Sequence, residues 1–115
     1  MTDDLSITRI YDLLYHLGIA ARYTGFFYTS YAVYLAIRQP ERLLLVTKWL
    51  YPAVAAHYHT TWQCVERNIR TVSAVAWQAQ RSLLESLAGY PLTRRPTATA
   101  FLAILASYFN SDQAA

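Results

Sequence analysis

The chain has 115 residues, of which 55% are hydrophobic and 15% are charged, and it contains a single cysteine. This composition excludes intrinsic disorder and predicts one compact domain, because a chain of this length buries roughly two thirds of its unfolded surface. The formal net charge is +3, and all but one of the basic residues are Arg. Arg suits bidentate contacts with phosphate or guanine, so nucleic acid is a candidate partner. The alternative is an ordinary charged surface without a ligand.

Three features predict a cytoplasmic protein with no membrane partner. Cys64 has no second cysteine with which to form an intramolecular disulfide, which favours a reducing compartment. The longest uncharged runs, 49–65 and 23–37, are too short to cross a bilayer. Asp3 and Asp4 stand where a secretory signal would carry positive charge.

Apolar residues recur at helical spacings of three and four along the chain, and no segment alternates as a strand does. Gly18 and Gly89 are suitable helix ends, and Pro40, Pro52 and Pro96 mark helix boundaries. The sequence therefore predicts an all-α fold, a compact domain of six to seven helices. The predicted helices cover 5–17, 27–38, 40–50, 52–58, 61–79, 82–88 and 98–109.

The longest predicted helix, 61–79, has two distinct sides. Its buried side is a stripe of apolar residues at spacings of four, three and four, namely Val65, Ile69, Val72 and Ala76. Its other side is polar on the early turns, where Glu66, Arg67 and Arg70 stand together. A shorter helix and a polar turn precede it, which is the layout of a helix-turn-helix over about 52–79. In that motif the second helix enters the major groove of DNA.

Residues inside and outside this motif together resemble a known family. The motifs that carry the resemblance are Leu50-Tyr51-Pro52, Val65-Glu66-Arg67, Ile69-Arg70 and Val75-Ala76-Trp77, with Leu17-Gly18-Ile19, Thr47-Lys48, Gly89-Tyr90 and Pro96-Thr97 outside it. They span about residues 8 to 109. The pattern is similar to the C-terminal DNA-binding effector domain of the stage-zero sporulation regulator A family, the response regulators that control sporulation in endospore-forming bacteria.

The resemblance implies a sequence-specific transcription regulator that reads TGTCGAA-like boxes in the major groove through helix 61–79. Glu66 and Arg67 match the family's base-reading pair, and Arg70 matches its neighbouring contact residue. The residue chemistry agrees, because Arg pairs with guanine O6 and N7 and Glu accepts from cytosine N4. The resemblance implies double-stranded DNA as a partner and a second copy of the chain on tandem sites. RNA polymerase is a further candidate partner, for the aromatic surface described below.

A further set of residues is predicted to contact the DNA backbone irrespective of base sequence. Thr60 and Thr61 cap the reading helix, which brings hydroxyl and backbone N–H groups near a phosphate. The full set is Lys48, Thr60, Thr61, Gln63, Arg81, Arg94 and Arg95. Each of the four cations taken alone is also compatible with an ordinary surface charge.

The chain departs from the family pattern on the reading helix and in its architecture. Gln63-Cys64 stands where the family commonly has Ser-Arg, which removes a positive charge. Thr71-Val72-Ser73-Ala74 replaces His-Ala-Ile-Glu, which removes a polar contact and an acid. The family's regulator also has a phosphate-accepting receiver domain, whereas residues 1–115 are predicted to form a single effector domain without one. We therefore expect that phosphorylation is not the switch within this chain.

Aromatic residues crowd the second predicted helix and favour an alternative function. They are Tyr23, Phe26, Phe27, Tyr28, Tyr31 and Tyr34. The alternative is a receiver-less protein-interaction module that modulates another regulator through this Tyr-rich surface. The competing explanation is that these Tyr residues pack their rings in the core and leave only their hydroxyls in water.

No other site chemistry is predicted. His57, His59 and Cys64 lie close together in the sequence but fit no standard zinc spacing, so no metal is expected. The sequence has no Ser-His-acid grouping, no paired carboxylates and no Gly-rich phosphate loop. We therefore expect neither catalysis nor a cofactor.

Overall fold

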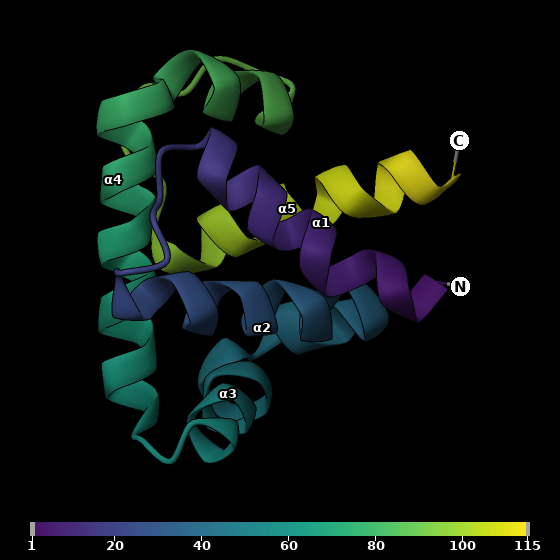
Figure 1. Cartoon of the computed structure of the whole chain (residues 1–115), viewed down its shortest axis with the longest axis vertical. Helices are drawn as coiled ribbons and strands as arrows, with labels where there is room; N and C mark the ends of the chain where they lie inside the picture. Colours follow the sequence, from purple (N-terminus) through teal and green to yellow (C-terminus); the bar gives the residue numbers. More distant parts are fainter. Residues whose placement is uncertain (1, 115) are drawn as a thin grey trace.

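The computed structural model describes residues 2–114, with side chains from residue 7 to residue 110. Within 2–114 every regular element is helical and no strand occurs, which confirms the all-α prediction. The elements are α1 (Thr2–His16), α2 (Thr24–Arg38), the 3-10 segment η1 (Pro40–Leu44), the π segment η2 (Val46–Leu50), α3 (Tyr51–His57), α4 (Trp62–Ala88) and α5 (Ala98–Ala114). Figure 1 shows α4 running along one side of the other helices.

Two predicted parts of the chain differ in detail from the structure. Segment 40–50 forms one 3-10 and one π turn rather than an α-helix. Pro52 lacks an N–H for the carbonyl of Lys48 and its ring crowds that carbonyl, so the regular helix restarts at Tyr51. The predicted helices 61–79 and 82–88 are joined as α4, with a kink at Gln80 (φ −142°, ψ 53°). The described chain therefore has five α-helices, close to the six or seven predicted.

The core is built around α2, which contacts α1, α4 and α5. At Gly25 the backbone of α2 comes very close to α4. A Cβ atom there would lie 2.5 Å from the Asn68 carbonyl oxygen and 2.5 Å from Val72 Cγ2. Only glycine fits this approach without a shift of one helix, so α2 fixes the position of α4.

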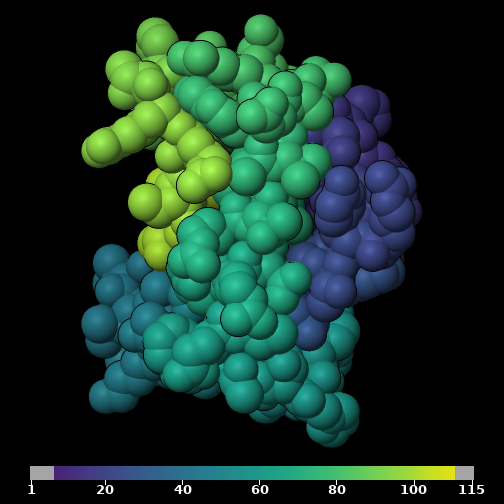
Figure 2. Space-filling view, turned by 90° about the vertical axis from the view of Figure 1, so that its left-hand side faces the viewer, coloured from purple at the N-terminus to yellow at the C-terminus, as the bar shows by residue number. Residues whose placement is uncertain are grey.

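The inward face of α4 is the stripe that the sequence predicts. Val65, Ile69, Val72 and Ala76 are all fully buried. Their spacing keeps them on one face of the helix, which leaves the opposite face in water. Figure 2 looks onto this outward side, and α4 runs uncovered down the middle of it.

A tight turn over residues 58–61 joins α3 to α4. His59 has a positive φ of 56°, which reverses the chain, and the Thr60 N–H donates to the Ala55 carbonyl at 2.9 Å. Thr61 is extended (φ −106°, ψ 155°) and its side chain accepts from the Cys64 N–H at 3.2 Å. Thr61 is therefore the N-cap of α4, as the sequence predicts. Together α3, this turn and the start of α4 form a helix-turn-helix.

Candidate nucleic-acid interface

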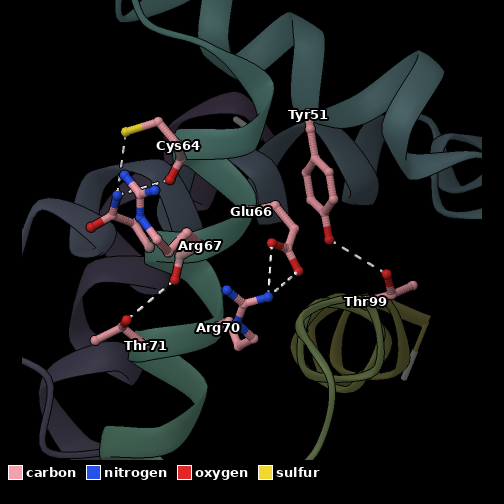
Figure 3. Close-up of polar contacts among 8 residues, drawn as sticks. Tyr51, Cys64, Glu66, Arg67, Arg70, Thr71 and Thr99 are labelled. Carbon is pink, nitrogen blue, oxygen red and sulfur yellow. Dashed lines mark hydrogen bonds and ion pairs between the residues drawn. The ribbon is translucent and has the colours of Figure 1, made fainter.

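Two of the predicted base-reading residues are paired with each other on the early turns of α4. The Arg70 Nη1 donates to both carboxylate oxygens of Glu66, at 3.1 and 3.2 Å (Figure 3). The Arg70 side chain is 50% exposed and the Glu66 side chain 29% exposed. An exposed ion pair at this spacing contributes only about 0.3–0.5 kcal/mol. A ligand that offers both side chains better partners can therefore separate them.

Arg67 is the third member of this group, and its guanidinium is available. The side chain is exposed and makes no hydrogen bond or ion pair with the part of the chain that the structure describes. Its backbone carbonyl accepts from the Thr71 hydroxyl at 3.2 Å (Figure 3). Glu66, Arg67 and Arg70 thus stand together outside the buried stripe, and we name them the reading group.

Cys64 lies one turn before the reading group, where the family pattern commonly has a basic residue. A hydrogen bond with Thr60 is the largest influence on the Cys64 thiol and lowers its pKa; burial opposes this effect, and the charge of Arg67 lowers the pKa further. The Asn68 amide donates to the Cys64 carbonyl at 2.8 Å and to its sulfur at 3.4 Å. This turn therefore carries a thiol with increased thiolate character beside Arg67, in place of a cation.

The predicted backbone-contact residues lie in three regions around α4. Thr60, Thr61 and Gln63 are at its N-terminus, Lys48 is exposed in η2, and Arg94 and Arg95 are exposed in the loop 89–97. Figure 2 shows the segments around residues 40 and 95 on the same side of α4, one near its start and the other further along it. Together with Arg67 and Arg70, the residues Lys48, Arg94 and Arg95 bring five exposed cations to α4 and the segments beside it.

Arg81, also predicted to contact the DNA backbone, is engaged within the chain. Its Nη2 donates to the Leu92 carbonyl at 2.7 Å. Its guanidinium carbon lies 4.1 Å from the centre of the Trp77 ring. The side chain is thus held against the loop 89–97 while about half of its surface stays exposed, at 52%.

Sequence reasoning missed the contacts that hold this loop to α4. The Leu92 N–H donates to Glu85 Oε2 at 2.7 Å, and the buried Ser73 hydroxyl donates to the Pro96 carbonyl at 2.9 Å. The four-residue spacing of a Trp, an Arg and a Glu would indicate one shared helix face only if the helix continued through residue 80, where the sequence predicts a break. Nothing in the local sequence indicates their partners on the loop, because those partners are backbone groups.

The aromatic residues of the second helix are mostly packed rather than displayed. Phe26 and Tyr28 are buried, and Tyr31 stacks on His57 with ring centres 4.1 Å apart. Phe27 remains 39% exposed. Another group of exposed apolar side chains, which sequence reasoning did not single out, consists of Leu44, Leu45 and Trp49.

The described residues contain neither a metal-binding cluster nor a membrane-spanning helix. No group of three His, Cys, Asp or Glu side chains there is arranged to hold a metal ion. No helix within residues 2–114 combines the length and the apolar character needed to cross a membrane.

The order of these parts, with the charged side chains on the second helix of the pair, is that of a helix-turn-helix DNA-binding domain. Residues 10–109 match the family model described as Sporulation initiation factor Spo0A C terminal. The match covers nearly the whole chain, and the chain belongs to this family of DNA-binding regulatory domains. The resemblance drawn from the sequence is thereby confirmed.

Proposed function

We propose that this chain is a sequence-specific transcription regulator that reads TGTCGAA-like boxes in the major groove through α4. The observation that carries the proposal is the reading group, exposed on the early turns of a capped helix whose opposite face is fully buried. A rigid helix with exposed charged side chains near its N-terminus is the geometry with which helix-turn-helix domains contact base edges.

The chemistry of the reading group matches the C·G and G·C pairs in the centre of such a box. Arg67, which makes no hydrogen bond or ion pair within the described part of the chain, supplies bidentate donors for guanine O6 and N7. Arg70 supplies a second guanidinium once it leaves Glu66, and the freed carboxylate accepts from a cytosine N4 amino group. Arg67 can therefore bind DNA directly, whereas Arg70 binds a base only after its ion pair with Glu66 opens.

Contacts to the DNA backbone complete the proposed interface. The residues assigned to phosphates are Lys48, Thr60, Thr61, Gln63, Arg94 and Arg95. They lie at the N-terminus of α4 and on the two segments beside it, so they can fix the register of the helix in the groove. These contacts supply affinity without sequence preference.

The test is a fluorescence-anisotropy titration of the purified chain over a salt series. One duplex carries two TGTCGAA-like boxes and the other carries the same bases scrambled. We expect tighter binding to the boxes at every salt concentration, with both affinities falling as salt rises. Equal binding to the two duplexes that vanishes with salt would overturn the proposal.

A second copy of the chain and RNA polymerase are further proposed partners. Titrations against duplexes with one box and with two boxes at helical spacing test the first. Steeper binding to the two-box duplex, with a Hill coefficient above one, supports contact between copies on DNA. Identical affinity per box on the two duplexes would argue against it. Contact with RNA polymerase is tested by measuring transcription from a two-box promoter with purified polymerase, in the presence and absence of this chain.

The alternative function remains a protein-interaction module that acts through aromatic surface. The observation in its favour is that Tyr15 and Phe27, from neighbouring helices, are 53% and 39% exposed. Equal binding to box and scrambled duplexes would favour this alternative. Phe27→Ser should then abolish binding of the protein partner while leaving DNA binding unchanged.

A further inference from the structure

The loop 89–97 between α4 and α5 is fixed to α4 at two points. At Leu92 both backbone groups are bound, the N–H to Glu85 Oε2 and the carbonyl to Arg81 Nη2, each at 2.7 Å. At Pro96 the carbonyl accepts from the fully buried Ser73 hydroxyl at 2.9 Å. The residues between these two points are therefore held at a set distance from the helix.

The first of these attachments is a closed group of side chains, which we name the clip: Trp77, Arg81 and Glu85. Arg81 Nε lies 3.5 Å from Glu85 Oε2, and its guanidinium lies over the Trp77 ring. The charges of Arg81 and Glu85 offset each other, so the clip adds little to the positive field of the surface. Its main action is on the backbone of Leu92.

Arg94 and Arg95 lie between the two attachments and are both exposed. Neither makes a hydrogen bond or an ion pair with the described part of the chain. The free positive charge of this loop therefore sits on a segment whose ends are fixed.

The two attachments also determine where the charges of Arg94 and Arg95 lie relative to α4. Glu66, Arg70, Ser73 and Trp77 follow one another at spacings of three and four, so they form one stripe along α4 up to the kink at Gln80. Beyond the kink, the contacts of the clip continue this stripe through Arg81 and Glu85. The loop returns along this stripe from Glu85 toward Ser73, next to the turn that carries Arg70. Figure 2 shows the loop lying alongside α4. Arg94 and Arg95 are thus displayed beside the same helix as the reading group.

We propose that the clip presets Arg94 and Arg95 as a phosphate-binding loop, and that Arg81 and Glu85 are positioning residues rather than phosphate contacts. This inference rests on the proposed function, because the ligand is the backbone of the DNA that the reading group contacts. Fixing a loop before binding removes the conformational entropy that it would otherwise lose on the DNA.

The decisive variant is Glu85→Ala, because two explanations predict opposite results. Removal of an acid makes the protein more positive, so a general electrostatic attraction predicts tighter DNA binding. The clip predicts weaker binding, because the Leu92 N–H loses its acceptor and the loop is released. We expect affinity for the two-box duplex to fall roughly threefold, with a smaller salt slope. Asp12→Ala, which removes an acid from α1, is the matched control and should not weaken binding.

A double-mutant cycle then separates positioning from direct contact. Arg94→Ala with Arg95→Ala should lower the slope of log affinity against log salt by about 2, as expected for two phosphate contacts. Arg81→Met should weaken binding in the natural chain and have no further effect once both loop arginines are Ala. Glu85→Gln keeps an oxygen acceptor and should retain most of the affinity. Faster hydrogen exchange of the Leu92 amide in Glu85→Ala reports release of the loop directly.

The outcomes distinguish this inference from the proposed function. Tighter binding of Glu85→Ala, or an additive effect of Arg81→Met, would overturn the clip while box preference in the natural chain still stands. Absence of box preference in the natural chain would overturn the proposed function and the clip with it. Box preference together with weaker binding by Glu85→Ala and a non-additive Arg81→Met supports both.

Discussion

The inward and outward faces of α4 are held by interactions of very different strength. On the inward face four apolar side chains are fully buried, and Gly25 of α2 leaves no room for a single extra carbon. Complete burial of one such side chain contributes about 1.5–3 kcal/mol. On the outward face the ion pair between Glu66 and Arg70 contributes about 0.3–0.5 kcal/mol. The position of the helix is therefore set by the core, and the outward residues can exchange partners without moving it.

The largest expected effect is on the inward face. Gly25→Ala should lower the free energy of unfolding by about 3 kcal/mol, because the new Cβ would meet the Asn68 carbonyl and Val72 and force α2 and α4 apart. Urea denaturation followed by circular dichroism measures the loss. Gly89→Ala is the control, since nothing lies within 4 Å of a Cβ there and only its positive φ of 86° is strained. That change should cost about 1 kcal/mol, and equal losses would contradict the close approach at Gly25.

The next effect is on the outward face and concerns binding instead of folding. Arg67→Ala should weaken binding to the box duplex by about 1–3 kcal/mol and reduce the preference over the scrambled duplex. The urea midpoint should stay unchanged, because the Arg67 side chain is exposed and makes no bond within the described chain. Arg9→Ala, which removes the same charge from α1, should preserve the preference. An equal loss on both duplexes for Arg67→Ala would count against base reading.

A smaller, uniform effect is expected outside α4. Lys48→Ala in η2 should weaken binding to box and scrambled duplexes alike and reduce the salt slope by about 1, as the loss of one phosphate contact predicts. Anisotropy titrations at four salt concentrations measure the slope. A change in the ratio of the two affinities would instead assign Lys48 to base recognition.

The smallest effect concerns Cys64 at the edge of the outward face. Because its pKa is lowered in the folded chain, the thiol should react with iodoacetamide at lower pH than an unstructured cysteine. Arg67→Ala should move this pH profile upward, since the Arg67 charge supports the thiolate. The unfolded chain holds the proton more tightly, so the unfolding free energy should rise as pH increases from the folded pKa toward about 8.5. Cys64→Ser should abolish both responses, and an unshifted profile would contradict the assigned environment.

The helices and the buried face of α4 could be predicted because their signals are local. The four-three-four spacing from Val65 to Ala76 is sufficient to place four residues in the core, and Thr61 has the chemistry of an N-cap. The outward position of Glu66, Arg67 and Arg70 could be predicted for the same reason, since these residues lie outside that buried stripe, whereas their contact with bases stays a prediction. The face of a helix on which a residue lies can be predicted from its spacing in the sequence alone.

The rest depends on contacts between segments far apart in the chain. The close approach of α2 to α4 at Gly25 is one such contact, because it depends on Asn68 and Val72 of another helix. The ion pair between Glu66 and Arg70 could be predicted from their four-residue spacing. The attachment of the clip to the loop could not, because Arg81 and Glu85 bind the backbone of Leu92. Every residue has a backbone carbonyl, so the sequence does not indicate that Arg81 binds the one at Leu92. This contact can be recognised only in the folded structure.

If the proposed function holds, the ion pair on the outward face affects how strongly the protein binds different DNA sites. A bare phosphate would satisfy Arg70 but leave the Glu66 carboxylate facing an anion, so random DNA gains little from opening the pair. A cytosine paired with guanine offers an amino donor to the acid and acceptors to the arginine at once. Under the proposed function, a site that offers both a donor and an acceptor therefore opens the ion pair more readily than the phosphate backbone alone, and a C·G pair is such a site.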